Sequence, residues 1–280
     1  MKLHFYGADR CVTGSCHCLE INGKRILVDC GLQQGRDELD NAMFAFNPGD
    51  IDILLVTHAH IDHTGRIPLL VKRGFTGRIL TTRLTADLMH IMLLDSAHIQ
   101  ESDAEYQNRK NQRAGRPNVE PLYTVADAMR VPEFLQTCEY HQTVDVCEGV
   151  KATFIDAGHL LGSASILMEL TEGGEKRNIV FSGDIGNVDQ PIIRDPQFFG
   201  GADYVVMEST YGNRNHTEVW SYTDDLAQII DETLGRGGNV VIPSFAVGRT
   251  QELLYFIREI KDRHLVTSVQ DFPVYVDSPL

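Results

Sequence analysis

Three things are missing from this 280-residue chain, and each absence excludes a class of protein. No stretch is long and apolar enough to cross a bilayer as a helix, so we expect no membrane association. The six cysteines lack the spacing of a disulfide framework, which in a chain of this length favours a reducing compartment. Residues 1–7 resemble a short strand and not a signal peptide, so we expect a cytoplasmic protein.

Positive charge is also scarce: the formal net charge is −14 and the pI is about 5.1. A protein that attracts nucleic acid through its overall field is basic, so any nucleic-acid binding here must depend on local groups or on bound metal. Arg214 and Arg249 are candidates for such groups, and the densest basic segment is 109–116. The alternative interpretation of that segment is a solvated helix end followed by a turn at Gly115, with no role in binding.

Residues 57–65 are the most informative part of the chain. His58, His60, Asp62 and His63 lie within six residues, directly after an apolar, strand-like run at 51–56. His58 and His60 are two residues apart, so in extended backbone they face the same side, whereas Asp62 and His63 follow at a turn into a helix. Imidazole and carboxylate suit zinc, and this one segment can therefore supply ligands to two neighbouring ions.

Other apolar runs end in the same way, with a polar residue next to a glycine that allows close backbone approach. His159 would complete three imidazoles with His58 and His60, Asp184 could bridge two metals, and Asp29 would hold a ligand or the loop from behind. A turn or a helix cap is the alternative explanation for a lone aspartate at a strand end. The runs concerned are 25–28 before Asp29, 150–155 before His159 and 178–181 before Asp184.

The patterns along the chain predict alternating α and β structure. We expect short strands within 2–56, a strand at 78–80, and strands from about 144 to 183, with helices at 63–74, 84–113 and 125–135. Pro132 should end or kink the last of these helices. After residue 213 we expect helices at 219–234 and 249–263 and strands at 239–242 and 274–276.

With these motifs the chain resembles the β-CASP nucleases, a branch of the metallo-β-lactamase-fold hydrolases, and is most similar to prokaryotic homologues of the mRNA 3′-end endonuclease. The matching elements are Asp29, the box at 58–63, Gly158 with His159, Gly183 with Asp184, and the segments 207–212, 242–249 and 274–279. The resemblance implies an α/β (α+β) fold: an αββα sandwich over 1–212, followed from 213 to 280 by the beginning of a β-CASP domain. In that family further histidine motifs and closing strands follow, so we expect both domains to be incomplete here.

The resemblance also implies a function, which is zinc-dependent hydrolysis of phosphodiester bonds in RNA at a two-metal centre. His58, His60 and His159 would hold one Zn²⁺, and Asp62, His63 and Asp184 the other, with Asp62, Asp184 and Glu208 as catalytic groups. Ser244, Arg249 and Asp277 would contact the substrate. Without the family's later histidines we expect weak activity and allow that a single Zn²⁺ binds.

Other functions remain open at this point. Single-stranded DNA is an alternative substrate, since some relatives with this second domain cut DNA. Hydrolysis of a small ester and a non-catalytic scaffold are further alternatives, although small-molecule members lack the segment after Gly212 and a scaffold has no need of an intact ligand set. The resemblance also allows a homodimer.

Overall fold

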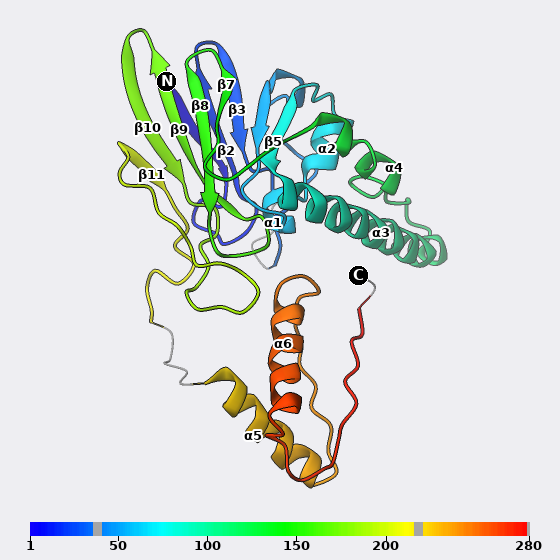
Figure 1. Cartoon of the computed structure of the whole chain (residues 1–280). Helices are drawn as coiled ribbons and strands as arrows, with labels where there is room; N and C mark the ends of the chain where they lie inside the picture. Colours follow the sequence, from blue (N-terminus) through cyan, green and yellow to red (C-terminus); the bar gives the residue numbers. More distant parts are fainter. Residues whose placement is uncertain (36–40, 216–220, 279–280) are drawn as a thin grey trace. The chain divides into compact units, whose positions relative to one another are not determined.

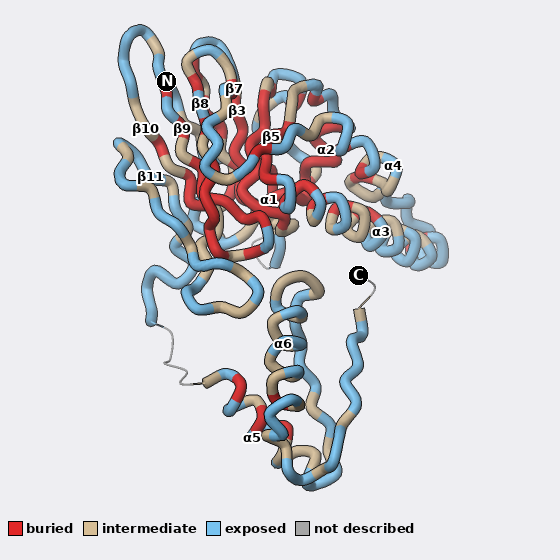
Figure 2. The backbone as a smooth tube through the Cα atoms, in the orientation of Figure 1, coloured by how far each residue is buried: buried red, intermediate tan, exposed pale blue. Residues whose placement is uncertain are grey.

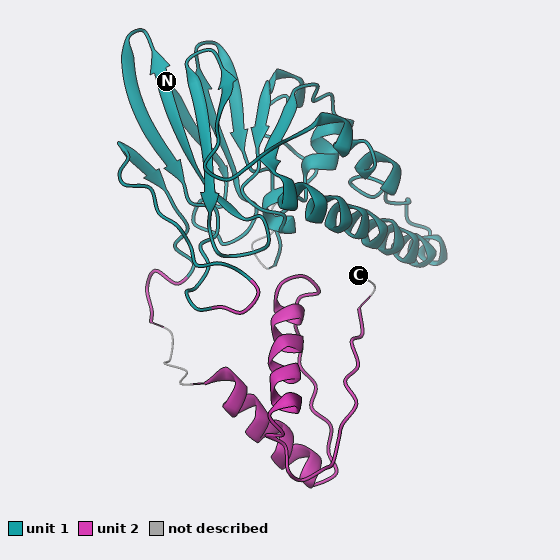
Figure 3. Ribbon diagram, viewed as in Figure 1, with its two compact units in different colours: residues 1–189, 193–210 teal, residues 190–192, 211–280 magenta. Residues whose placement is uncertain are grey.

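The computed structural model describes residues 1–35, 41–215 and 221–278, so Pro279 of the terminal motif and the expected helix start at 219 lie outside it. The chain divides into two compact units, shown in Figure 3. Unit 1 comprises 1–189 and 193–210, and unit 2 comprises 190–192 and 211–280. The assignment of two domains at 1–212 and 213–280 stays a prediction.

Unit 1 contains two mixed β-sheets (Figure 1). In the first sheet β1–β3 are antiparallel and β3–β6 are parallel, in the order β1-β2-β3-β4-β5-β6. The strands are β1 (Lys2–Gly7), β2 (Cys16–Ile21), β3 (Lys24–Val28), β4 (Ile53–Leu55), β5 (Arg78–Thr82) and β6 (Leu135–Cys138). The second sheet has the order β11-β10-β9-β8-β7 and is antiparallel except between β10 and β11. Its strands are β7 (Thr143–Cys147), β8 (Val150–Asp156), β9 (Ala164–Glu172), β10 (Glu175–Phe181) and β11 (Tyr204–Val206).

The hydrophobic core lies between the two sheets and appears in red in Figure 2. Alternate residues of a strand point to opposite faces, so Ile26 and Leu55 of the first sheet meet Phe154 and Ile166 of the second. The intervening residues of the first sheet, such as Leu54, are equally buried on its other face, where helices cover them. Parallel strands are usually buried on both faces in this way.

Four helices of unit 1 lie on the side of the first sheet, and α3 contacts β5 and β6 directly. They are α1 (Ile61–Thr64), α2 (Ile67–Lys72), α3 (Arg83–Ala114) and α4 (Val125–Ala128). On the second sheet, outward residues such as Glu169 are exposed. The expected α+β sandwich is therefore confirmed, and its described helices cover the first sheet.

Two helices predicted from sequence are interrupted by proline. The helix expected at 63–74 is two helices, because Pro68 cannot donate to the carbonyl four residues earlier and its ring clashes there. The helix expected at 125–135 ends at Ala128 and is followed by a 3₁₀ turn, Val131–Phe134, that contains Pro132. Strand β6, which pairs with β5 in parallel, was not predicted, and only its first residue, Leu135, falls within the expected helix.

Unit 2 contains α5 (Tyr222–Gly235) and α6 (Arg249–Asp262), which pack through Ala227, Ile230 and Ile260. The strands predicted at 239–242 and 274–276 are wrong: these residues form no strand among those described. A strand requires a partner for its backbone groups, and here Val241 and Tyr275 are both 86% exposed.

Candidate metal centre

The candidate site lies where strands of both sheets end. His58 and His60 follow β4, Asp29 follows β3, His159 follows β8 and Asp184 follows β10, as the sequence predicted. Parallel strands β3 and β4 deliver their residues to one edge, and the second sheet delivers His159 and Asp184 to the same place. Two sheets packed on a common core thus bring together residues more than a hundred positions apart in the chain.

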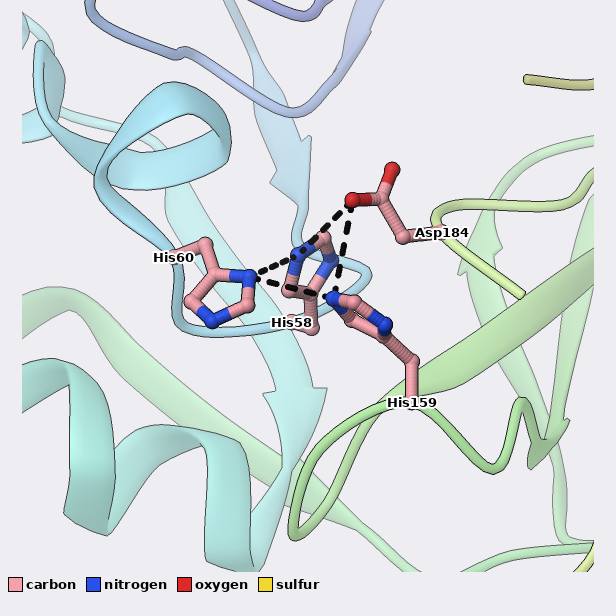
Figure 4. A group of neighbouring side chains, drawn as sticks. All are labelled: His58, His60, His159 and Asp184. Atoms are coloured by element: carbon pink, nitrogen blue, oxygen red, sulfur yellow. Dashed lines mark hydrogen bonds and ion pairs between the residues drawn. The ribbon is translucent and has the colours of Figure 1, made fainter. Parts of the chain in front are cut away.

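His58, His60, His159 and Asp184 form a cluster in which one ligand atom from each lies within 4.8 Å of all the others (Figure 4). The Nδ1 atom of His60 lies 3.1 Å from Nε2 of His58 and 3.1 Å from Nε2 of His159. Three imidazole nitrogens and one carboxylate oxygen at this spacing are a donor set that zinc accepts. The donors present therefore fit the metal expected from the sequence.

Asp184 faces two different groups of histidines with its two oxygens. Its Oδ2 lies 3.8 Å from Nε2 of His58 and 3.6 Å from Nε2 of His159, whereas its Oδ1 lies 3.2 Å from Nε2 of His63. That nitrogen of His63 is also 3.9 Å from Oδ2 of Asp62. His63 therefore lies beside both Asp62 and Asp184, and through Asp184 the pair of Asp62 and His63 adjoins the four-residue cluster.

Asp29 is buried behind His63 and binds it through Oδ2, which is 2.7 Å from Nδ1. The same carboxylate accepts hydrogen bonds from the backbone N–H and the hydroxyl of Thr57, at 2.8 and 2.9 Å. Asp29 has a φ of +60°, a left-handed conformation that is uncommon outside glycine and is retained where surrounding contacts enforce it. Asp29 thus contacts His63 on the side away from Asp184, a position from which it can orient that ring.

The loops that present the ligands depend on close backbone contacts. A Cβ on Gly31 would overlap the carbonyl oxygen of Asp62, so only glycine fits there. The Ser163 hydroxyl accepts hydrogen bonds from the backbone N–H groups of His159 and Leu160, both at 3.1 Å. Ser163 and Thr57 were not predicted as site residues, because they are common hydroxyl residues whose role appears only when the strands are paired.

Burial and neighbouring charges separate the histidines into two kinds. Burial lowers the pKa of His60 to about 4, and it lowers the pKa values of His58 and His159 as well, so these three rings are neutral and free to act as ligands. Burial would also lower the pKa of His63, but Asp29 and Asp184 overcome it and raise that pKa well above the usual value. A metal ion at His63 would have to displace a proton.

We expect the metal-free protein to lose stability as the pH falls from about 6.5 to about 4. In this range His60 becomes protonated in the unfolded chain but stays neutral in the folded protein. For His60 alone the loss is about 3 kcal/mol. Urea unfolding of chelator-treated protein at several pH values measures it, and His60→Gln should show a shallower slope. The control His90→Ala changes an exposed residue of α3, and equal slopes in all three proteins would contradict the expectation.

A cavity of about 580 Å³ opens beside this cluster and is lined by Asp62, His63, Asp184 and Glu208 among others. Glu208 follows β11 and accepts hydrogen bonds from the backbone N–H of Ile185 at 2.8 Å and from the hydroxyl of Thr210 at 2.7 Å. The structure therefore places Glu208 in the same cavity as the predicted ligands. Its catalytic role stays a prediction.

The three residues predicted to contact substrate belong to unit 2. The Arg249 guanidinium is paired with Glu252 at 2.7 Å, and the Ser244 hydroxyl lies 2.7 Å from that of Thr250. Asp277 lies in the segment that forms no strand. Their role in binding stays a prediction.

Comparison with known proteins agrees with this geometry. Residues 9–213 match the Metallo-beta-lactamase superfamily, and the chain belongs to that superfamily. The metallo-β-lactamase type of sandwich expected from the motifs is thereby confirmed. Among the described residues, no helix is long and apolar enough to cross a membrane.

Relatives within the superfamily include RNA-processing nucleases, which confirms the resemblance to the β-CASP branch. The chain is 36% identical to Ribonuclease TTHA0252 of Thermus thermophilus, and the match covers 100% of this chain and 59% of the relative. It is 32% identical to the transcription termination factor FttA of Methanosarcina mazei, covering 94% and 39%. It is 30% identical to Endoribonuclease YSH1 of Eremothecium gossypii, covering 92% and 32%. The chain thus spans three-fifths or less of the length of these relatives.

Proposed function

We propose that this chain hydrolyses phosphodiester bonds in RNA with a two-zinc centre. The observation that supports the proposal is the position of Asp184, whose Oδ2 faces His58 and His159 while its Oδ1 faces His63. A carboxylate placed in this way can bridge two ions. RNA is proposed as the substrate because two of the similar proteins are named ribonuclease and endoribonuclease.

The proposed ligands fall into two groups, one for each ion. His58, His60 and His159 would hold one, and Asp62 and His63 the other, with Asp184 shared. Bound zinc lowers the pKa of a water molecule towards neutrality and takes up negative charge on the phosphoryl oxygens. Asp62 would orient that water, and Asp29 keeps the His63 ring turned toward Asp184. Glu208, held by Ile185 and Thr210, would face the leaving oxygen.

Metal content per folded chain, measured by elemental mass spectrometry after desalting, tests the centre. We expect close to two zinc ions for the wild type and about one or fewer for His159→Ala. His90→Ala replaces an exposed histidine of α3 and should leave the content unchanged. No more than one ion in the wild type would contradict the two-metal proposal.

Cleavage of labelled single-stranded RNA by the same preparations tests the substrate. We expect zinc-dependent cleavage by the wild type and by His90→Ala, and none by His159→Ala. Single-stranded DNA of the same sequence and a chromogenic ester are assayed in parallel. Zinc-dependent turnover of DNA or ester, with RNA left intact, would refute RNA as the substrate.

A further inference from the structure

Phe5, His17 and Phe181 form an aromatic wall of the cavity beside the predicted ligands. Phe5 and His17 are paired across β1 and β2, and their rings meet edge to face with centroids 5.2 Å apart. His17 in turn stacks on Phe181 at 6.1 Å with 22° between the ring planes. Phe181 is buried, so the rings form a continuous row from the core to the cavity.

Phe5 is the exposed end of this row. It belongs to the cavity lining, yet 51% of it is accessible, which leaves a large apolar ring facing water. The neighbouring His17 lies between the Phe5 and Phe181 rings, and its buried Nδ1 makes no hydrogen bond within the described part of the chain. The wall therefore presents flat aromatic surface to the cavity.

Arg10 supplies a permanent positive charge beside the wall. Arg10 is the one arginine or lysine that lines the cavity among the described residues, and it is exposed and has no ion pair there. It has a φ of +60°, and Ala8 one of +51°, so this loop holds two non-glycine residues in a sparsely populated conformation. In a chain with a net charge of −14, an exposed arginine at a cavity whose charged lining residues are mainly carboxylates suits an anionic ligand.

We propose that Phe5 and His17 form a stacking subsite for one nucleobase of the RNA strand, next to the phosphate that reaches the ligand cluster. The volume of about 580 Å³ lies within the range of roughly 300–1,000 Å³ usual for small-ligand sites. Aromatic side chains stack bases of any sequence, because every base has a π-face. Arg10 contacts the strand's backbone beside that base. The identity of the ligand rests on the proposed function, whereas the aromatic wall does not.

Abasic substitution separates stacking from backbone binding. A short labelled single-stranded RNA with a cleavage-resistant phosphorothioate backbone is prepared with one base removed at each position in turn, and its affinity is measured by fluorescence anisotropy with zinc-loaded protein. For the wild type we expect removal of one particular base to weaken binding about tenfold. Phe5→Ala should bind the intact RNA about tenfold more weakly and should be insensitive to the same removal. Phe5→Trp should restore both the affinity and the sensitivity.

Tyr106→Ala is the matched control, since Tyr106 is 54% exposed, belongs to α3 and does not line the cavity. Arg10→Gln should weaken all of the RNAs equally and reduce the dependence of binding on salt. Equal sensitivity of the wild type and Phe5→Ala to every abasic position, or no binding of RNA at all, would overturn the subsite. Base-dependent binding without zinc-dependent cleavage would instead support the subsite and refute the proposed function.

Discussion

Asp184→Asn is expected to lower zinc-dependent RNA cleavage by much more than 100-fold. Losing a residue that only supports a ligand typically costs about 10- to 100-fold in metal affinity or activity. Asp184 is itself a proposed ligand of both ions, so its loss should cost more. Its two oxygens lie 3.2 Å from Nε2 of His63 and 3.6 Å from Nε2 of His159. An amide has one oxygen acceptor and no negative charge, so it cannot serve both groups.

Two measurements separate this effect from misfolding. Metal content should fall from about two ions to one or fewer, and the urea midpoint of the metal-free protein should show that the variant is folded. Asp189→Asn makes the same chemical change at an exposed position five residues further along the chain and should leave cleavage unaltered. Cleavage by Asp184→Asn within tenfold of the wild type would rule out Asp184 as a bridging ligand.

The position of the proposed ligand box at the end of a strand was predictable because its information is local. Because His58 and His60 are two residues apart, they are expected to face the same side. Because they follow an apolar strand, they are expected at the edge of the sheet where that strand ends. His159 and Asp184 were predictable for a related reason, since each follows an apolar run and adjoins a glycine. The structure brings all four together within 4.8 Å.

The supporting residues were not predictable in the same way. Thr57 and Ser163 look like ordinary strand and turn residues, and their hydrogen bonds depend on the pairing of distant segments. The aromatic row is similar: Phe5, His17 and Phe181 come from three strands in two sheets. Only the register between β1 and β2 and the packing of the sheets place them side by side.

The two wrong strands in unit 2 have a different cause. Val241 and Tyr275 lie in apolar, β-branched or aromatic segments that favour extended backbone, so local propensity predicted strands. Sheet formation also requires a neighbour to complete the hydrogen bonds, and the described residues of unit 2 supply only helices and irregular segments. Sequence propensity alone thus could not show that these segments have no partner strand among the described residues.

Asp29→Ala is expected to destabilise the metal-free protein by about 3–5 kcal/mol, the usual cost of removing one partner of a buried ion pair. His63 would lose the carboxylate 2.7 Å from its Nδ1, and the backbone N–H of Thr57 would lose its acceptor. The φ of +60° adds to the cost, because alanine tolerates it poorly whereas asparagine accepts it. Asp29→Asn should therefore retain part of the lost stability.

The pH dependence of this loss identifies its electrostatic part. Asp29 helps to raise the pKa of His63, so the stabilisation is complete below about 6.5, where the unfolded histidine is also protonated, and it declines as the pH rises through the higher folded pKa. The destabilisation by Asp29→Ala, measured by urea unfolding, should accordingly be larger at pH 6 than at pH 9. Ser15→Ala removes only a 3.4 Å contact to the same carboxylate and should cost no more than about 1 kcal/mol at either pH. An equal loss for Asp29→Ala at both values would mean that Asp29 acts on His63 as a hydrogen-bond acceptor and not through its charge.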